Sequence, residues 1–439
     1  MESYLRDIIR QKIVDATAVP LPGLTRRDAY VPAIPHKATA VIGMRRSGKT
    51  SFLWQLLAQR HVAGVSREGL LYFGFEDERL AGMTVQQLDW LLQEYYRLFP
   101  AWRDGRRAAF FLDEIQVVPG WEAFARRLLD SESVDCYISG SSARLLSREI
   151  ATSLRGRAVE VVIYPFSFRE VLRHQGLEPA KPTARWTKAE RSVLEHRLLD
   201  YCRSGGFPEA QGLGLRDRFE LLRGYVDVVL LRDIIERHAV SQPLALRWLV
   251  RQLLGNAAGT FSINKFHGDL KSQGMAIGKE TLHAFLGFLE DAFLIRVVSL
   301  ATDSERRRMV NPRKVYPIDP GLIPVFDRTG KANVGHALET AVLLELERRG
   351  AEVSYVITPA GFEVDFLARY PGGDEELIQV CASLDEPATA AREWRALTDA
   401  RALCSRAACI LIALDIPAGT VVPEGMSLQR APDWLLGSS

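Results

Sequence analysis

The feature that most constrains the fold is the octet GMRRSGKT, which spans residues 43–50. It follows the apolar run ATAVI at residues 38–42 and precedes SFLWQLLAQR, an amphipathic stretch with helical spacing. A strand, a glycine loop and a helix in this order surround an anion with backbone N–H groups at the start of the helix. The octet therefore predicts a phosphate-binding loop at the carboxyl edge of a parallel α/β sheet.

The residue types in this loop predict ATP and Mg²⁺ as cofactors. Lys49 would contact the β- and γ-phosphates, and the Thr50 hydroxyl would coordinate Mg²⁺. The glycines would let the backbone approach the phosphates closely. We expect the nucleotide to be held by the loop and the first residues of the helix: Gly43, Arg46, Ser47, Gly48, Lys49, Thr50 and Ser51.

Two acids follow the apolar run AAFFL at residues 108–112. Asp113 would end a buried strand and hold Mg²⁺, together with Thr50. Glu114 would polarise the water that attacks the γ-phosphate. The alternative is that both acids cap the start of a helix. Beside an intact phosphate loop, we interpret the pair as catalytic, which predicts an ATPase.

Polar residues after the next strand supply further catalytic candidates. The run VDCYISGSS ends in Ser141 and Ser142, and either hydroxyl would orient the attacking water, although serines also populate turns. Arg155 and Arg157 come next, and each is a candidate arginine finger, in cis or across a subunit interface. The alternative for each arginine is a solvated loop position.

Length, cysteine usage and hydropathy narrow the class of protein. At 439 residues the chain is too long for one core. Its five cysteines form neither a disulfide framework nor a zinc pattern. No apolar run reaches the roughly 20 residues of a membrane helix, and the N-terminus lacks the apolar region of a secretory signal. We expect a cytoplasmic protein of several domains, without membrane association and without a structural metal.

Charge is distributed unevenly along the chain. From residue 331 to the end there are 9 Lys+Arg against 16 Asp+Glu, a net charge of −7, which leaves +9 for residues 1–330. A basic N-terminal part is compatible with nucleic-acid binding. The alternative is that the surplus arginines coat solvated helices.

The middle of the chain predicts helices at residues 166–240, which would form a lid that moves on hydrolysis. Residues 260–300 predict two helices joined by a glycine-containing turn, and a β wing would follow, as in a winged helix. Basic residues of these elements would contact DNA phosphates: Lys271, Lys279, Arg306, Arg307, Arg308, Arg313 and Lys314. The alternative is a lid or protein–protein element.

The C-terminal part carries acids in the pattern of a metal-dependent nuclease. Glu339 on an amphipathic helix, Asp365 in FEVDFLA and Gln379 in LIQVCASL would lie close together. Such sites place a lysine two residues after the position of Gln379, but Cys381 stands there and QVCASL holds no basic residue. Because a cysteine cannot stabilise phosphate charge as a lysine does, we expect an inactive domain. A nuclease that takes a lysine or arginine from elsewhere is the alternative.

The chain resembles the archaeal-type AAA family of P-loop ATPases, which carry a C-terminal domain of unknown function similar to the PD-(D/E)xK nuclease fold. The segments that carry the resemblance follow one another over nearly the whole chain: GMRRSGKTSFL, FFLDEIQVVPGWE, ISGSSARLL, LRGRAVEVVIYPFSFREVL, GGFPEA, LLRDIIERH, NPRKVYPIDPGL and FEVDFLA…LIQVCASL. The resemblance implies ATP hydrolysis with Mg²⁺, carried here by Lys49, Thr50, Asp113 and Glu114.

The same resemblance implies four domains in an α/β chain. An AAA-like P-loop ATPase domain would occupy residues 1–165, a helical lid 166–240, a winged-helix segment 241–320, and an inactive nuclease-like domain 321–439.

We therefore predict an AAA-type protein that binds and hydrolyses ATP with Mg²⁺. It would couple hydrolysis to the handling or remodelling of double-stranded or branched DNA through the winged helix. One alternative is an ATP-dependent signalling switch that presents a protein-binding surface, and another is an ATP-gated nuclease. Assembly into a homo-oligomer is compatible with an AAA module.

Overall fold

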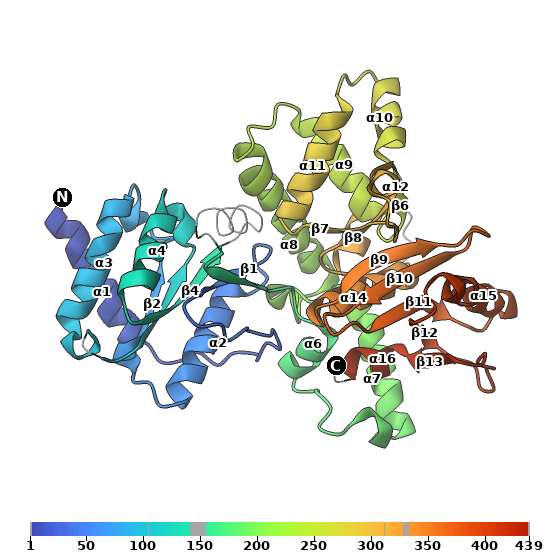
Figure 1. Cartoon of the computed structure of the whole chain (residues 1–439), viewed down its shortest axis with the longest axis horizontal. Coiled ribbons are helices and arrows are strands. Elements are labelled where there is room, and N and C mark those ends of the chain that lie inside the picture. The colour runs from blue at the N-terminus through green and yellow to red at the C-terminus, as the bar shows by residue number, and fades with distance from the viewer. Residues whose placement is uncertain are drawn as a thin grey trace. The chain divides into compact units, whose positions relative to one another are not determined.

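The chain folds into two compact units, which are described separately (Figure 1). The first comprises Met1–Tyr164 with Asp291–Phe293, and the second comprises Pro165–Glu290 with Leu294–Ser439. The computed structural model describes residues 2–103, 105–140, 154, 156–310, 312–327 and 333–437. Among these residues, no helix combines the length and the apolar character needed to cross a lipid bilayer. The four-domain division stays a prediction.

A five-stranded parallel sheet forms the centre of the first unit, with the strand order β2-β3-β4-β1-β5. Its strands are β1 (Ala38–Ile42), β2 (Leu70–Gly74), β3 (Ala108–Asp113), β4 (Val134–Gly140) and β5 (Ala158–Val162). Strands β1 and β3 are buried along their whole length, which explains their continuous apolar sequences. This sheet confirms the predicted α/β class. All five strands end at one edge, where the glycine loop begins.

Helices cover this sheet. They are α1 (Glu2–Ala18), α2 (Lys49–Val62), α3 (Leu88–Leu98) and α4 (Trp121–Ser131), with single 3₁₀ turns η1 (Arg67–Gly69), η2 (Glu78–Leu80), η3 (Val85–Gln87), η4 (Pro100–Trp102) and η5 (Ile115–Val117). Helix α1 is attached to α3 through Glu94, whose buried carboxylate accepts from Arg6 at 3.2 Å and from Arg10 at 2.9 Å. Such paired burial satisfies a charge that would otherwise oppose folding.

The second unit begins with helices, as predicted for residues 166–240. They are α6 (Phe168–His174), η6 (Thr183–Arg185), α7 (Lys188–Ser204), η7 (Pro208–Ala210), α8 (Leu215–Val228) and the π-helix η8 (Val229–Glu236), which continues α8. Helix α6 starts with a capping box between Ser167 and Glu170, and α7 starts with one between Thr187 and Glu190. These boxes supply acceptors for backbone N–H groups that have no partner inside the helix.

A small antiparallel sheet with the strand order β6-β8-β7 follows. Its region contains α9 (Pro243–Gly255), β6 (Thr260–Phe261), α10 (Ile263–Ser272), α11 (Lys279–Asp291), β7 (Ile295–Val298), α12 (Glu305–Val310) and β8 (Arg313–Pro317). The two helices predicted within residues 260–300 are present as α10 and α11. The predicted β wing corresponds to β7 and β8, and the segment between these strands holds the short helix α12.

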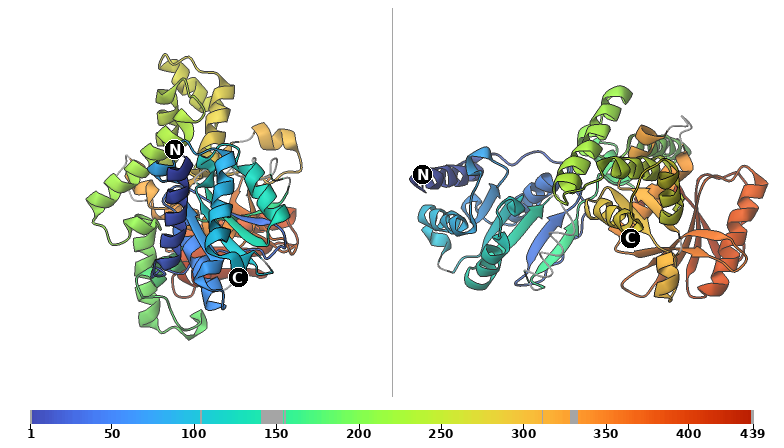
Figure 2. Two further views of the ribbon diagram at one scale, coloured as in Figure 1. Left: turned by 90° about the vertical axis from the view of Figure 1, so that its left-hand side faces the viewer. Right: turned by 90° about the horizontal axis from the view of Figure 1, so that it is seen from above.

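The rest of the second unit is a five-stranded sheet with the order β13-β12-β11-β10-β9. Its elements are α13 (Leu322–Phe326), α14 (Val334–Arg348), β9 (Glu352–Ile357), β10 (Glu363–Arg369), β11 (Glu375–Ser383), α15 (Pro387–Leu403), β12 (Ala408–Asp415), β13 (Met426–Arg430) and α16 (Ala431–Leu436). Strands β9–β11 are antiparallel and β11–β13 parallel. Side chains alternate between two cores, one with α14 and one with α15, which runs along one side of the sheet (Figure 2).

Two motifs distant in the sequence, GGFPEA and YPIDPGL, meet at the buried carboxylate of Asp319. It accepts hydrogen bonds from the backbone N–H groups of Gly206 at 2.6 Å and Gly321 at 2.9 Å. A Cβ on Gly205 would overlap this carboxylate, and Gly205 has φ 73°, so the position requires glycine. Burial raises the pKa of Asp319 to about 7.

Asp319 should therefore make the free energy of unfolding of the second unit fall as the pH rises from about 4 to about 7. Within this window the folded chain holds a proton on Asp319 that the unfolded chain releases, so each pH unit lowers the stability by up to about 1.4 kcal/mol. Thermal unfolding of the wild type and of Asp319→Asn across this range measures the difference. Identical pH dependence in both proteins would contradict the raised pKa.

Candidate functional site

The loop between β1 and α2 takes its shape from residues with left-handed backbone. The φ angles are 149° at Gly43, 66° at Arg46 and 100° at Gly48. A Cβ on Gly43 would overlap the carbonyl oxygen of Ile163, so this position requires glycine. Gly48 caps α2, and the first turn of a helix has backbone N–H groups without intrahelical acceptors. The octet thus has the tight glycine turns and the helix start that an anion cradle needs.

Polar side chains inside the loop fit a phosphate group. Lys49 is buried, and its Nζ donates to the carbonyl oxygens of Gly43 at 3.2 Å and Met44 at 3.1 Å. Ser47 is fully buried, and its Oγ has no hydrogen-bond partner in the described parts of the chain. A buried hydroxyl without a partner is costly, and phosphate oxygens accept from hydroxyl, ammonium and backbone N–H donors alike. Arg46 and Ser51 are exposed at the rim.

Asp113, the last residue of β3, is the centre of a polar network. Its Oδ2 accepts from Thr50 Oγ1 at 2.8 Å and from the Tyr72 hydroxyl at 2.7 Å, and its Oδ1 accepts from Ser139 Oγ. One carboxylate thus connects α2 with strands β2, β3 and β4. Burial and the charge of Asp113 raise the pKa of Tyr72, so that the phenol remains a donor. A hydroxyl beside a carboxylate is a pair of hard oxygen ligands that suits Mg²⁺.

Glu114 leaves the sheet in an uncommon conformation, with φ 53° and ψ 41°. Its backbone N–H donates to Ser139 Oγ at 3.0 Å, and its carboxylate accepts from Gln116 Nε2. A non-glycine residue in this region is strained, and such strain collects at functional sites. Within the described residues, no group of three His, Cys, Asp or Glu side chains could hold a metal. A Mg²⁺ ion here would take much of its coordination from phosphate and water.

Arg27 holds the loop from the N-terminal side, although nothing in the sequence pattern marks it. Its guanidinium donates to the carbonyl oxygens of Ser47, at 2.9 Å, and of Tyr164. The backbone N–H and carbonyl of Arg27 bond to the side chain of Gln55 on α2, at 2.7 and 3.0 Å. Arg27 lies in a segment without regular structure, so no periodicity indicates its burial. The sequence pattern did not indicate Tyr72 and Ser139 either.

The predicted polar residues after β4 do not all join this network. Ser142 and Arg155 lie outside the described residues. Arg157 pairs with Asp130 of α4 and directly precedes β5, which runs parallel to β1. It therefore lies at the amino edge of the sheet, about 16 Å from the carboxyl edge over a strand of this length. Arg157 is therefore too far from the phosphate loop to act as an arginine finger within the same chain. A role of Arg157 across a subunit interface stays a prediction.

A second polar centre lies in the second unit, around Lys314 of β8. Its Nζ donates to Glu339 Oε1 at 2.7 Å and Asp365 Oδ1 at 2.9 Å, and lies 3.0 Å from Glu363 Oε1. Only 2% of Lys314 is exposed, so the expectation that it contacts DNA from the wing is wrong. A lysine from elsewhere in the chain thus reaches the two acids, although Cys381 replaces the one expected in the sequence.

The charges in this centre depend on one another. Burial alone would lower the pKa of Lys314, but Asp365, Glu339 and Glu363 raise it, which keeps the ammonium charged. Burial and the charge of Asp365 raise the pKa of Glu339. Tyr316 donates to Glu339 Oε1 at 2.6 Å, and burial and Glu339 raise its pKa. The result is a buried cluster in which the ammonium is the counter-ion of the acids.

Gln379 lies beside this cluster, and its hydrogen-bond partners are groups other than Lys314. Its Oε1 accepts from the Asp365 backbone N–H at 3.2 Å, and its Nε2 donates to Glu393 of α15 at 2.7 Å. The second oxygen of Asp365 accepts from the Val380 N–H at 3.0 Å. Cys381 donates to the carbonyl of Ser383, a local contact that leaves the cluster untouched. The structure therefore brings Glu339 and Asp365 together, with Gln379 as a support.

Two segments of the chain match known protein families. Residues 35–172 match a family described as "AAA domain", and residues 195–331 match a "Domain of unknown function (DUF8612)". The Walker-type ATPase PABY2304 of Pyrococcus abyssi is a similar solved structure, with 17% identity, a TM-score of 0.40, and coverage of 73% of this chain and 95% of that chain.

Curated relatives extend the match over most of the chain. An uncharacterized protein of Haemophilus influenzae is 29% identical over 79% of this chain and 82% of the relative. The uncharacterized protein MJ1544 of Methanocaldococcus jannaschii is 35% identical over 82% of this chain and 78% of the relative. The chain therefore belongs to the family of MJ1544, and its residues 35–172 carry an AAA domain with a P-loop.

Proposed function

We propose that this protein hydrolyses ATP with Mg²⁺ at the loop that joins β1 and α2. The observation that carries the proposal is the contact between Thr50 Oγ1 and Asp113 Oδ2 at 2.8 Å. It places a hydroxyl of the phosphate loop and a carboxylate from the end of β3 at the same point. Thr50 and Asp113 would hold Mg²⁺ there, and the ion would supply positive charge to neutralise the phosphates.

Different residues of the chain would have different roles in hydrolysis. Lys49 would bind the β- and γ-phosphates, and Arg27 would hold the loop in shape as a positioning residue through the Ser47 carbonyl. Glu114 would take the proton of the attacking water. The water oxygen bonds to the γ-phosphorus as the bond to the β–γ bridging oxygen breaks, so that ADP and phosphate leave. Ser139 would fix the positions of Glu114 and Asp113 relative to each other, since its hydroxyl bonds to both.

Glu114→Gln should bind ATP like the wild type and hydrolyse it about a hundredfold to ten-thousandfold more slowly, because an amide cannot accept the proton. Lys49→Ala should lose ATP binding, because the phosphates lose their ammonium partner. Calorimetric titration with ATP and assays of phosphate release separate the two effects. Normal turnover by Glu114→Gln would show that another group is the base.

We further propose that hydrolysis is coupled to the handling of double-stranded or branched DNA by residues 241–320, through a winged-helix arrangement. Two helices, α10 and α11, precede the hairpin of β7 and β8, which is the element order of such a module. Cationic side chains on these helices and on α12 are exposed and suit phosphate contact: Lys271, Lys279, Arg306, Arg307 and Arg308. Lys314 is excluded from this set by its burial.

Double-stranded DNA should therefore stimulate ATP turnover, with a stimulation that falls steeply as salt rises. Changing Arg306, Arg307 and Arg308 together to Gln should weaken it, whereas the same change at exposed Lys188, Arg216 and Arg406 should not. Turnover rates with and without DNA at several salt concentrations measure the stimulation in the wild type and in both triple variants. DNA-insensitive turnover together with a co-purifying protein would instead favour the signalling switch.

The cluster around Lys314 supports the proposal that the C-terminal domain is an inactive nuclease-like domain. Its topology, a helix followed by antiparallel and then parallel strands, brings Glu339 and Asp365 together as expected. The ammonium of Lys314 lies within 3.0 Å of three carboxylates and so occupies the place that a divalent cation would need. A metal would have to displace a buried, well-paired charge, which is unfavourable.

Supercoiled DNA incubated with the protein and Mg²⁺ or Mn²⁺ should therefore remain intact, because no open carboxylate pair is left for the metal. Gel electrophoresis over a time course detects a single nick per plasmid. Asp365→Ala is the control that separates activity of this site from a contaminant. Nicking by the wild type that disappears in Asp365→Ala would mean that a metal displaces Lys314 and that the domain is an ATP-gated or free nuclease.

A further inference from the structure

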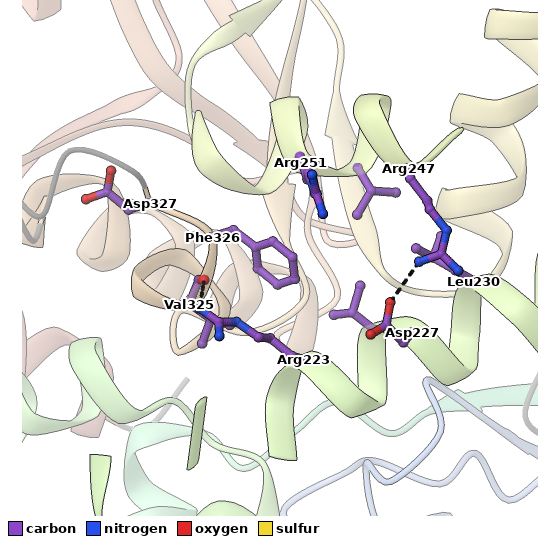
Figure 3. A pocket seen from close by; sticks show the side chains of 10 residues that line it. Arg223, Asp227, Leu230, Arg247, Arg251, Val325, Phe326 and Asp327 are labelled. Atoms are coloured by element: carbon purple, nitrogen blue, oxygen red, sulfur yellow. Dashed lines mark hydrogen bonds and ion pairs between the residues drawn. The ribbon is translucent and has the colours of Figure 1, made fainter. Parts of the chain in front are cut away.

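A cavity of about 320 Å³ opens in the second unit among α8, the π-helix η8, α9 and α13 (Figure 3). Half of its ten lining residues are charged, and the other half are four aliphatic side chains and one aromatic ring. The residues that the argument uses are Arg223, Arg247, Arg251, Asp227, Asp327 and Phe326. A volume in this range is that of a small ligand site. None of the residues that line this cavity belongs to the P-loop.

Two of the three arginines have weak partners within the protein. Arg223 reaches the carbonyl oxygen of Val325 only at 3.5 Å. Arg247 pairs with Asp227 at 3.2 Å, and both side chains are about half exposed, a setting in which ion pairs contribute little. In the described parts of the chain, no acceptor bonds to Arg251. The guanidinium donors on this wall can therefore be redirected to a ligand at little cost.

The chemistry of the wall selects a phosphate attached to a ring. A guanidinium presents a planar fork of N–H donors that matches two oxygens of a phosphate. The side chain of Arg251 extends from α9 on the same side of the cavity as the Phe326 ring (Figure 3). An aromatic face beside arginines is the combination on which nucleic-acid bases stack. Two aspartates reduce the net charge, so a bare anion would be held less well than a phosphate with apolar contacts.

The backbone beside the cavity is also unusual. The π-helix Val229–Glu236 continues α8 without a break and contributes Leu230 to the wall. π-helical turns are rare and occur frequently at functional sites, since each must be stabilised by its surroundings. This segment contains LLRDII, whose Arg232 pairs with Glu236 on the exposed side. We propose that the cavity binds one nucleotide unit, with its phosphate on Arg223, Arg247 and Arg251 and its base against Phe326.

The test uses the full chain with Lys49→Ala, which removes phosphate binding at the P-loop. Calorimetric titration with 5′-AMP and with adenosine compares the same base with and without a phosphate. AMP should bind, and adenosine should bind at least about tenfold more weakly, because only the phosphate engages the guanidinium groups. Adding Arg251→Gln should weaken AMP binding about tenfold, and Arg247→Gln should do the same.

The matched control is Arg216→Gln, which lies on α8 with 89% of its side chain exposed and does not line the cavity. It should leave AMP binding unchanged, and melting temperatures should show that all variants fold. A 5′-phosphorylated oligothymidine of about twelve nucleotides separates the two sources of the phosphate. Binding of the oligonucleotide with the same dependence on Arg251, without binding of AMP, would place the nucleotide unit in a strand and support the proposal.

Three results would overturn the proposal. One is equal binding of AMP and adenosine, because the arginines would then not recognise a phosphate. Another is the absence of binding of both AMP and the oligonucleotide at millimolar concentration. The third is binding that survives Arg251→Gln and Arg247→Gln unchanged, which would place the ligand elsewhere.

Discussion

The carboxylate of Asp113 is the interaction on which the rest of the candidate site depends. It accepts from Thr50, Tyr72 and Ser139, so a single acid joins the helix after the phosphate loop to three strands of the sheet. Because Ser139 also accepts from the Glu114 N–H, the strained turn that carries the proposed base is tied to the same point. The phosphate loop, Asp113 and Glu114 are thereby held together, which is the preorganisation that the proposed phosphoryl transfer requires.

The two carboxylate centres of the chain show how neighbours decide what an acid can do. Around Asp113 the partners are hydroxyl groups, which can rearrange to admit a hard cation and phosphate oxygens. Around Glu339 and Asp365 the partner is the ammonium of Lys314, which already satisfies the charge. The acids of the second centre therefore link β8 to helix α14 through Glu339 and to strand β10 through Asp365. Similar residues thus have hydroxyl partners in one unit and an ammonium partner in the other.

Local sequence patterns predicted the parts of the structure that depend on local chemistry. The octet of residues 43–50, the buried strand before Asp113 and the helices within residues 166–240 follow from spacing and polarity over a few residues. Arg27, Tyr72 and Ser139 could not be found in this way, because their roles depend on contacts between distant segments. Lys314 is the clearest case: it looked like one of several basic wing residues, but its partners lie 25 and 51 positions away. Burial of a charge is a tertiary property.

The dependence of nucleotide affinity on Mg²⁺ is the sharpest test of the proposed site. Calorimetric titration with a non-hydrolysable ATP analogue, in Mg²⁺ and in EDTA, should show tighter binding by the wild type in Mg²⁺. Thr50→Val, which keeps the shape and removes the hydroxyl, and Asp113→Asn should both lose this gain and keep the affinity measured in EDTA. Equal affinity of the wild type in both conditions, or an undiminished gain in both variants, would contradict the proposed Mg²⁺ site at Thr50 and Asp113.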